Sequence, residues 1–140
     1  MGMRILGWGT ALPEKVVTNH DLEKTLETSD EWIRERSGIR ERRIGGSTAE
    51  LAIQAGRAAI ESAGVDPASI DLTILATTTP DQQVPATSAH VHRALGLGGG
   101  AFDLNAACSG FVKRAVLGEI RPWRFVQAKE IAYAVLVVYE

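Results

Sequence analysis

A single cysteine, Cys108, stands among small residues where it could act as a nucleophile. The stretch Asn105-Ala-Ala-Cys-Ser-Gly-Phe111 follows the apolar run Ala101-Phe-Asp-Leu104. If that run is a strand and a helix begins at Ser109, the cysteine lies on a sharp strand-to-helix turn, as in a nucleophile elbow. The N-terminus of a helix also favours thiolate over thiol. On these residues a buried structural cysteine is an equal alternative.

A second group of candidates is a tryptophan beside a run of arginines. Five arginines and two glutamates lie within residues 34–43, a local charge of 5 − 2 = +3 in a chain of net charge −2. Trp32 precedes Arg36 by four residues, so both side chains lie on one face of a predicted helix. An exposed indole beside a guanidinium can stack a base and bind a phosphate. The alternatives are a solvated charged face and a tryptophan in the core.

Two further patterns do not predict sites. Gly96-Leu-Gly-Gly-Gly-Ala101 fits G-x-G-x-x-A, but it follows a predicted helix and precedes a strand, which reverses the order of a dinucleotide site. We interpret it as a tight connection. His90 and His92 are two residues apart on a helix and point to different sides. With one cysteine and no H-E-x-x-H motif, we expect no metal site.

Strand and helix patterns alternate along the chain, which predicts an α/β fold with a mainly parallel sheet. The clearest helix opens on the capping box Ser47-Thr-Ala-Glu50 and stops at Gly64. Asn19 is expected to cap a short helix, and Thr28 or Ser29 a second one. The predicted strands are 3–10, 72–77, 101–104 and 131–139, and the predicted helices are 20–26, 30–37, 48–63, 85–95 and from 109 onward.

Bulk composition indicates one intracellular domain. The chain has 140 residues, 45% of them hydrophobic, which is enough for a core. A net charge of −2 gives no general attraction to nucleic acid. A single cysteine is typical of a reducing compartment. Neither an apolar run long enough for a membrane helix nor a signal peptide is found, so we expect a cytoplasmic protein without membrane association.

Three segments together resemble one family. They are Thr28-Ser-Asp-Glu-Trp-Ile-Arg-Glu-Arg-Ser-Gly-Ile-Arg-Glu-Arg-Arg43, Ile74-Leu-Ala-Thr-Thr-Thr-Pro-Asp81 and Asn105-Ala-Ala-Cys-Ser-Gly-Phe-Val112. From about Met3 to Val112 the chain resembles the N-terminal portion of β-ketoacyl-acyl-carrier-protein synthase III, of the thiolase superfamily. The resemblance implies a thiolase-like fold and an acyltransferase that initiates fatty-acid synthesis by decarboxylating condensation of acyl-CoA with malonyl-acyl-carrier-protein.

The resemblance also assigns expected roles to residues. Cys108 matches the nucleophile that takes the acyl group as a thioester. Thr28 and Trp32 match the groups that hold the adenine of CoA, and Arg36 matches a contact to a CoA phosphate. Thr87 matches a dimer-interface position that bounds the partner's acyl pocket. Acyl-CoA is then a substrate rather than a cofactor, acyl carrier protein is the second partner, and the family is usually homodimeric.

The length of the family sets a further expectation. Its members are more than twice as long, and their catalytic His and Asn lie in the C-terminal half. We therefore expect residues 1–112 to be the N-terminal half of such a domain, a truncated βαβαβ half-domain, and residues 113–140 to be a divergent tail with one helix and one strand. The alternative function is a catalytically inactive half-domain that binds CoA or pairs with an intact synthase subunit.

Overall fold

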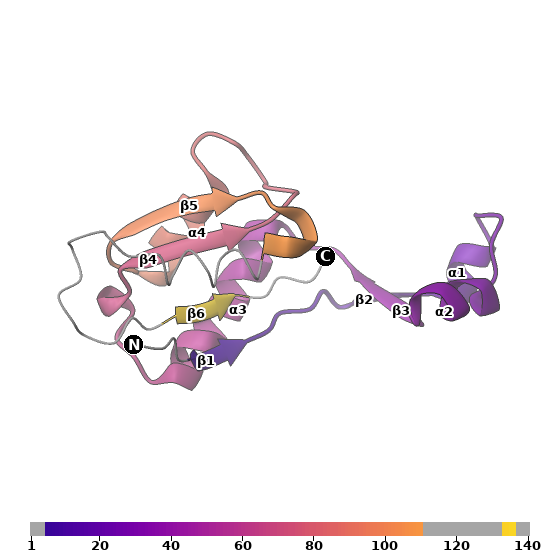
Figure 1. Cartoon of the computed structure of the whole chain (residues 1–140), viewed down its shortest axis with the longest axis horizontal. Helices are drawn as coiled ribbons and strands as arrows, with labels where there is room; N and C mark the ends of the chain where they lie inside the picture. The colour runs from indigo at the N-terminus through magenta and orange to yellow at the C-terminus, as the bar shows by residue number, and fades with distance from the viewer. Residues whose placement is uncertain (1–4, 111–132, 137–140) are drawn as a thin grey trace. The chain divides into compact units, whose positions relative to one another are not determined.

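A computed structural model describes residues 5–110 and 133–136, which form two compact units (Figure 1). Unit 1 combines residues 5–11 with residues 47–110 and 133–136, and unit 2 is Leu12–Gly46. Within the described ranges, no helix is both long and apolar enough to cross a membrane. Each unit has its own secondary structure and is described separately.

Unit 1 is built from strands that pair in parallel and helices that pack on them. Strand β4 pairs with β5 in register, and β1 pairs in parallel with β6. Helix α3 lies against β1, and α4 packs on β4 and β5 (Figure 1). These pairs confirm the predicted α/β class. The elements of unit 1 are β1 (Ile5–Gly9), α3 (Thr48–Ala63), η1 (Pro67–Ser69), β4 (Leu72–Ala76), α4 (Thr87–Leu95), β5 (Gly100–Leu104), η2 (Ala107–Ser109) and β6 (Tyr133–Leu136).

Glycines in β1 allow its backbone to lie directly on α3. A Cβ atom built on Gly9 would lie 2.3 Å from the carbonyl oxygen of Ala55. The same atom on Gly7 would lie 2.5 Å from the carbonyl oxygen of Ala59. Since real Cβ atoms do not approach so closely, no larger residue fits without moving the backbone. Helix α3 contributes small residues to the same contact, because Ala55 and Ala59 are completely buried.

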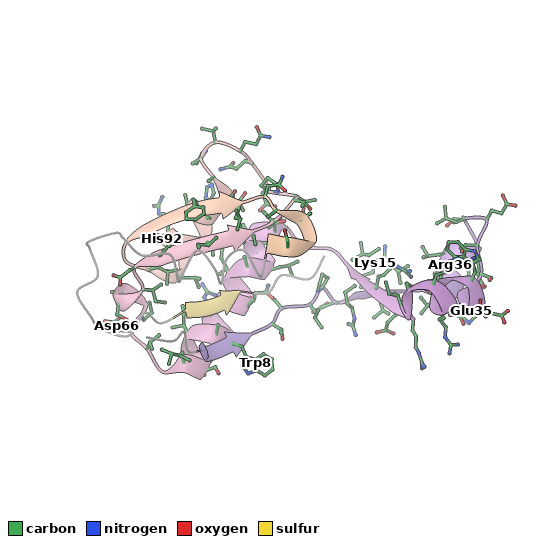
Figure 2. The ribbon with its side chains drawn as sticks, viewed as in Figure 1. Trp8, Lys15, Glu35, Arg36, Asp66 and His92 are labelled. Carbon is green, nitrogen blue, oxygen red and sulfur yellow. The ribbon has the colours of Figure 1, made fainter. Side chains whose placement is uncertain are left out.

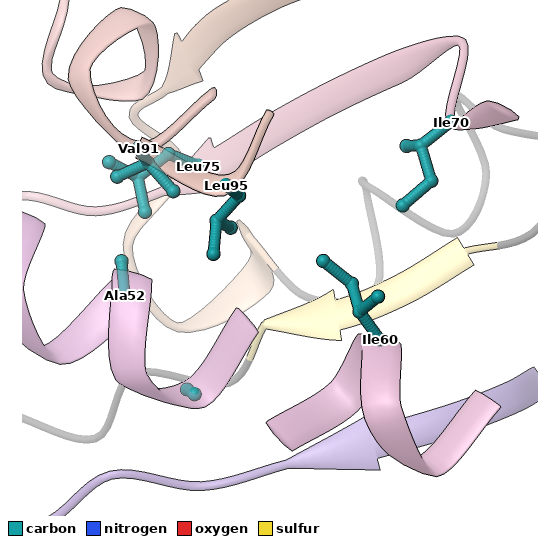
Figure 3. Close-up of a cluster of buried hydrophobic side chains, with 7 residues drawn as sticks. Ala52, Ile60, Ile70, Leu75, Val91 and Leu95 are labelled. Atoms are coloured by element: carbon teal, nitrogen blue, oxygen red, sulfur yellow. The ribbon is translucent and has the colours of Figure 1, made fainter. Parts of the chain in front are cut away.

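The hydrophobic core of unit 1 lies where α3, α4 and β4 meet (Figure 3). Aliphatic side chains from both helices and the strand pack against one another there. Leu75 and Val91 are among the largest fully buried side chains in the described residues. The core cluster consists of Ala52, Ala55, Ile60, Ile70, Leu75, Val91 and Leu95.

The start of α3 confirms the predicted capping box and adds a carboxylate to it. The Glu50 amide donates to Ser47 Oγ at 3.2 Å, and the Ser47 amide donates to Glu50 Oε2 at 3.0 Å. Asp81, in the loop after β4, accepts from the amides of Thr48 at 2.9 Å and Ala49 at 2.8 Å. A carboxylate at this end satisfies free N–H groups and complements the helix dipole. The loop is therefore attached to α3.

Unit 2 contains an antiparallel strand pair that the sequence patterns did not predict. Its strands are four residues each: β3 has the sequence Glu-Arg-Arg-Ile, with three charged residues, and β2 has the sequence Lys-Val-Val-Thr, with two adjacent valines. Neither sequence shows the alternation that marks a strand. The prediction of a mainly parallel sheet therefore holds for unit 1 but not for this pair. The elements of unit 2 are β2 (Lys15–Thr18), α1 (Asn19–Glu23), α2 (Asp30–Ser37) and β3 (Glu41–Ile44), with β2 pairing with β3.

The predicted cap of the first short helix was wrong by one residue. Thr18 caps α1: the Asp21 amide donates to Thr18 Oγ1 at 3.2 Å, and the Thr18 amide donates to Asp21 Oδ2 at 3.1 Å. This reciprocal pair satisfies the helix start without Asn19. Asn19 is instead the first residue of α1 and is 1% exposed. The helix ends at Glu23 rather than at Leu26.

A single glutamate links α1 to α2. Glu23 Oε2 lies 3.1 Å from Nδ1 of His20, and Glu23 Oε1 accepts from the backbone amide of Asp30. The hydrogen bond that His20 donates to Glu23, followed by the negative charge of Glu23, raises the pKa of His20 above 6.5. The hydrogen bond from His20 lowers the pKa of Glu23 in return, with the Asp30 amide as the next cause.

Part of the predicted C-terminal region lies outside the described residues. Gly110 has helical backbone angles, φ −56° and ψ −40°, while the rest of the helix expected from Ser109 onward lies beyond the described range. The strand expected at 131–139 is present as β6. The remainder of the expected tail, 113–132 and 137–140, is also outside the described residues.

The contact between β1 and α3 predicts a strong effect of one added methyl group. Gly9→Ala places a Cβ atom against the backbone of α3, so we expect the free energy of unfolding to fall by about 1–3 kcal/mol. Urea unfolding followed by circular dichroism measures this change. Trp8→Phe, on the same strand at a side chain that is 68% exposed, is the control and should shift stability by at most about 0.5 kcal/mol. Equal stability of Gly9→Ala and wild type would contradict the close contact.

The His20–Glu23 contact predicts a measurable titration. Folding raises the pKa of His20. The His20–Glu23 contact therefore stabilises the fold below about pH 6.5, and this stabilisation disappears as the pH rises through the folded-state pKa of His20. Glu23→Gln removes the charge and should return the pKa of His20 toward 6.5. NMR titration of the imidazole C–H resonances measures the pKa of His20 in the wild type and in Glu23→Gln. A histidine pKa that does not change in Glu23→Gln would show that the contact is not formed in solution.

Candidate functional site

Helix α2 presents the first group of candidate side chains. Ser29 caps it, since its hydroxyl accepts from the Trp32 amide at 3.1 Å. Gly38 ends it with a left-handed backbone, φ 72°, as the glycine after the helix predicted. Of the two predicted caps, Thr28 and Ser29, the structure selects Ser29. These two ends define an eight-residue helix that holds Trp32 and Arg36.

Trp32 and Arg36 stack on each other at the surface of α2. The guanidinium carbon of Arg36 lies 4.4 Å from the centroid of the Trp32 ring. Figure 2 labels Arg36 among the side chains of unit 2. Trp32 is 52% exposed, so it is not a core residue. The predicted juxtaposition at a spacing of four residues is therefore present. An accessible aromatic face beside a fixed cation can accept a flat heteroaromatic ring and an anionic group together.

The other arginines of residues 34–43 do not form one uniform basic surface. Arg34 Nη1 lies 3.2 Å from Asp30 Oδ2, and Arg42 Nη1 donates to Asn19 Oδ1 at 2.7 Å. Arg43 Nη2 lies 3.7 Å from Glu41 Oε1. Asp30, Asn19 and Glu41 therefore contact three of the five arginines, and Arg36 stacks on Trp32.

Thr28, the third predicted residue of this group, precedes the cap of α2. Its backbone amide donates to the carbonyl oxygen of Leu26 at 2.9 Å. Its hydroxyl oxygen is buried and has no hydrogen-bond partner in the described part of the chain. A buried hydroxyl without a partner is costly, so a ligand or a water molecule that bonded to it would stabilise the site.

Cys108 lies on a turn at the end of β5, as the sequence predicted. The turn η2 spans Ala107–Ser109, and the Ser109 amide donates to the carbonyl oxygen of Ala106 at 3.1 Å. Ala107 has φ 45°, the one positive value for a residue other than glycine in the described ranges. Such a conformation costs free energy and occurs often at functional turns. Gly110 keeps the turn close to β4, since an added Cβ would lie 3.1 Å from Ala76 Cβ.

A carboxylate four residues before this turn, that of Asp103, joins β5 to α4. Asp103 accepts from the Thr87 amide at 3.0 Å and from the Ser88 amide at 2.7 Å. Thr87 is completely buried, and its hydroxyl donates to the carbonyl oxygen of Gln82 at 3.2 Å. The predicted role of Thr87 at a dimer interface stays a prediction, because its described contacts lie within unit 1.

Sequence reasoning missed Asp81 and Asp103, two carboxylates that reach the N-termini of α3 and α4 from other segments of unit 1. Asp81 follows Pro80 in a loop, where an aspartate is ordinary. Asp103 offers a stronger signal, because it interrupts the apolar strand Gly100–Leu104. A charged residue inside a short strand needs a partner when it is partly buried, and that requirement could have indicated a helix N-terminus nearby.

The glycine run after α4 and His92 each make structural contacts in unit 1. Gly99 has φ 68°, and an added Cβ would lie 1.9 Å from the carbonyl oxygen of Asp71, which fits a tight connection between α4 and β5. His92 Nδ1 lies 3.1 Å from the hydroxyl of Thr73. Across residues 5–110 and 133–136, no cluster of three or more His, Cys, Asp or Glu side chains could hold a metal ion.

The candidate residues therefore form two groups. Thr28, Trp32 and Arg36 lie in unit 2, and Cys108 and Thr87 lie in unit 1. Within unit 2 the structure brings Trp32 and Arg36 into contact. Within unit 1, Cys108 and Thr87 are connected through β5, which carries Asp103.

Known proteins with similar sequences share one name. No protein-family model matches the chain. The chain is 58% identical over 110 residues to β-ketoacyl-[acyl-carrier-protein] synthase III of Roseiflexus sp. (strain RS-1), covering 76% of this chain and 33% of that protein. It is 48% identical over 131 residues to β-ketoacyl-[acyl-carrier-protein] synthase III 1 of Bacillus cereus, covering 91% of this chain and 41% of that protein. The chain thus spans about a third of the length of such relatives.

Solved structures give the same result. The chain matches 3-oxoacyl-[acyl-carrier-protein] synthase III from Aquifex aeolicus VF5 with a TM-score of 0.80 and 45% identity, over 84% of this chain and 39% of that one. It matches β-ketoacyl-[acyl-carrier-protein] synthase III from Thermus thermophilus with a TM-score of 0.76 and 39% identity, over 82% and 37%. The resemblance predicted from sequence is therefore confirmed: this chain is homologous to the N-terminal part of β-ketoacyl-[acyl-carrier-protein] synthase III and shares its thiolase-like α/β fold.

Proposed function

We propose that this chain carries the acyl-accepting and CoA-binding part of an acyltransferase that initiates fatty-acid synthesis. Cys108 takes the acyl group from acyl-CoA, and Thr28, Trp32 and Arg36 hold the CoA. The observation that carries this proposal is the exposed Trp32–Arg36 stack, 4.4 Å apart, in a chain homologous to synthases of this name. The cysteine turn at the end of β5 supports the catalytic part.

The chemistry of CoA suits the side chains of α2. Its adenine is a flat heteroaromatic ring that stacks on an indole face, and its phosphates attract a guanidinium. Because Arg36 is already seated over Trp32, one ligand can satisfy both groups without reorganising the helix. The unpartnered hydroxyl of Thr28 supplies a polar contact at the start of the same segment.

The proposed acyl transfer is nucleophilic catalysis by a thiolate. The thiolate sulfur of Cys108 attacks the thioester carbonyl carbon of acyl-CoA and forms a new S–C bond. The S–C bond to CoA then breaks, and CoA leaves as a thiolate that takes a proton from water. In the condensation that follows, malonyl-acyl-carrier-protein loses CO₂, and its carbanion attacks the Cys108 thioester and releases the thiolate. The residues next to Cys108 in the sequence, Ala107 and Ser109, are small.

The proposed partners follow from the same homology. Acyl-CoA and acyl carrier protein are the substrates, the assembly is a homodimer in which Thr87 helps to bound the partner's acyl pocket, and the location is the cytoplasm. No metal or other cofactor is required for the proposed steps. The names of the relatives, each a synthase acting on an acyl-carrier-protein, support this assignment.

A second candidate function is CoA binding without acyl transfer, either by this chain or in association with an intact synthase subunit. The observation that favours it is that the Trp32–Arg36 stack is complete within unit 2. The stack contains no residue of unit 1, where Cys108 lies, so CoA binding to the stack does not require acyl transfer to Cys108. The two candidates differ in whether Cys108 becomes acylated.

Incubation with acetyl-CoA tests the first candidate. We expect mass spectrometry to find one acetyl group on the peptide that contains Cys108, and none on Cys108→Ala, because the chain has a single cysteine. Circular dichroism of the same samples establishes that the protein is folded. A folded wild-type chain that binds CoA but remains unacetylated would reject acyl transfer and leave the second candidate.

The Trp32 ring should dominate CoA affinity. Stacking of a base on an aromatic side chain contributes about 1–3 kcal/mol, so Trp32→Ala should raise the Kd for CoA by roughly five-fold or more. Isothermal titration calorimetry measures this directly. Trp8→Ala is the matched control, since Trp8 is 68% exposed in unit 1 and should leave the Kd within about two-fold. Unchanged affinity in Trp32→Ala would contradict the assignment of α2 as the CoA site.

A further inference from the structure

One buried amide holds both ends of the helix that carries Trp32 and Arg36. Asn19 Nδ2 donates to Asp30 Oδ1 and to the carbonyl oxygen of Ile39, each at 2.8 Å. Asp30 is the first residue of α2, and Ile39 follows the glycine that ends it. The two donor hydrogens of this amide therefore bracket the eight residues between them.

The same side chain also ties the helix to β3. Asn19 Oδ1 accepts from Arg42 Nη1 at 2.7 Å, and the Asn19 backbone amide donates to the carbonyl oxygen of Arg40 at 3.3 Å. Asn19 is 1% exposed, so these contacts replace water rather than compete with it. A buried amide whose donors and acceptor are all engaged specifies one arrangement of the groups around it.

Helix α2 needs such support because it is short. An isolated helix of eight residues is unstable in water, so its position depends on tertiary contacts. Ile33 is the buried side chain that anchors its inner face. Hydrophobic contact at one residue does not set the rotation of a helix, whereas directional bonds at both ends do.

We propose that Asn19 is a positioning residue for CoA: its amide fixes α2 so that Trp32 and Arg36 are presented together to the ligand. The proposal rests on the proposed function for the ligand, but the geometric part concerns unit 2 itself. Asparagine is required because aspartate at this position would set its carboxylate against two acceptors, Asp30 Oδ1 and the Ile39 carbonyl oxygen. The hydrogen bond from Asn19 is also the largest cause of the lowered pKa of Asp30.

Exchanging the two partners provides the test. Asn19→Asp removes the donors and adds a like charge beside Asp30. Asp30→Asn is the matched control, since its amide oxygen can still accept from Asn19. The double variant Asn19→Asp/Asp30→Asn restores one donor–acceptor pair in reverse. All four proteins are made with Trp8→Phe and Trp123→Phe, so that fluorescence reports on Trp32 only.

Two readouts are taken from each protein. The first is the emission maximum and acrylamide quenching of Trp32, which need no ligand. The second is the Kd for CoA by calorimetry. We expect Asn19→Asp to change the Trp32 signal and raise the Kd by about ten-fold, and Asp30→Asn to stay within about two-fold. The double variant should regain the Trp32 signal in part and bind at least about three-fold more tightly than Asn19→Asp.

The outcomes separate this proposal from the proposed function. A wild-type chain that does not bind CoA would reject the function, and the Trp32 signal would then decide the role of Asn19. A wild-type-like Trp32 signal in Asn19→Asp would overturn the positioning role. If Asn19→Asp loses its fold and the double variant does not recover it, a general loss of stability explains the effect and the proposal is also overturned.

Discussion

The close contact of β1 with α3 is the constraint on which unit 1 depends. Gly7 and Gly9 have no side chains to separate the strand from the helix, and α3 offers Ala55 and Ala59 in return. This proximity positions α3 so that its other residues join α4 and β4 in the core. The strand β5, and with it the turn at Cys108, pairs with the strand that this core supports.

Carboxylates at helix ends connect the strands of unit 1 to its helices and so help to position the turn at Cys108. Asp81 attaches the loop after β4 to α3, and Asp103 attaches β5 to the start of α4. Each carboxylate accepts two amide N–H groups, which suits its charge to the positive end of a helix. The position of β5 is thus set on one side by its pairing with β4 and on the other by the start of α4. In unit 2 the neutral amide of Asn19 connects separate segments in a similar way. An amide suits this position because it faces both an acceptor, Asp30 Oδ1, and a donor, Arg42 Nη1.

Sequence patterns correctly predicted the features that depend on only a few adjacent residues. The capping box at Ser47, the stop at Gly64 and the spacing of Trp32 and Arg36 each depend on neighbours in the same helix, and each is present. Contacts between distant segments could not be predicted from adjacent residues. The strands of the β2–β3 pair are short and lack apolar–polar alternation, and the hydrogen bonds of Asn19 reach residues 11 to 23 positions away. Asn19 was predicted as a cap because it fits that role locally, but Thr18 and Asp21 form a better reciprocal pair.

The division into two units has a consequence for how the chain folds. Unit 2, Leu12–Gly46, is inserted between β1 and α3, which are the two elements whose backbones must meet. Closing a flexible loop costs more conformational entropy as the loop grows, by about 0.6 kcal/mol for each doubling of its length. When unit 2 is folded, most of that intervening chain is already ordered, so the loop that remains to be closed is shorter. Mutations that weaken unit 2 are thus expected to slow the docking of β1 on α3, although they touch neither element.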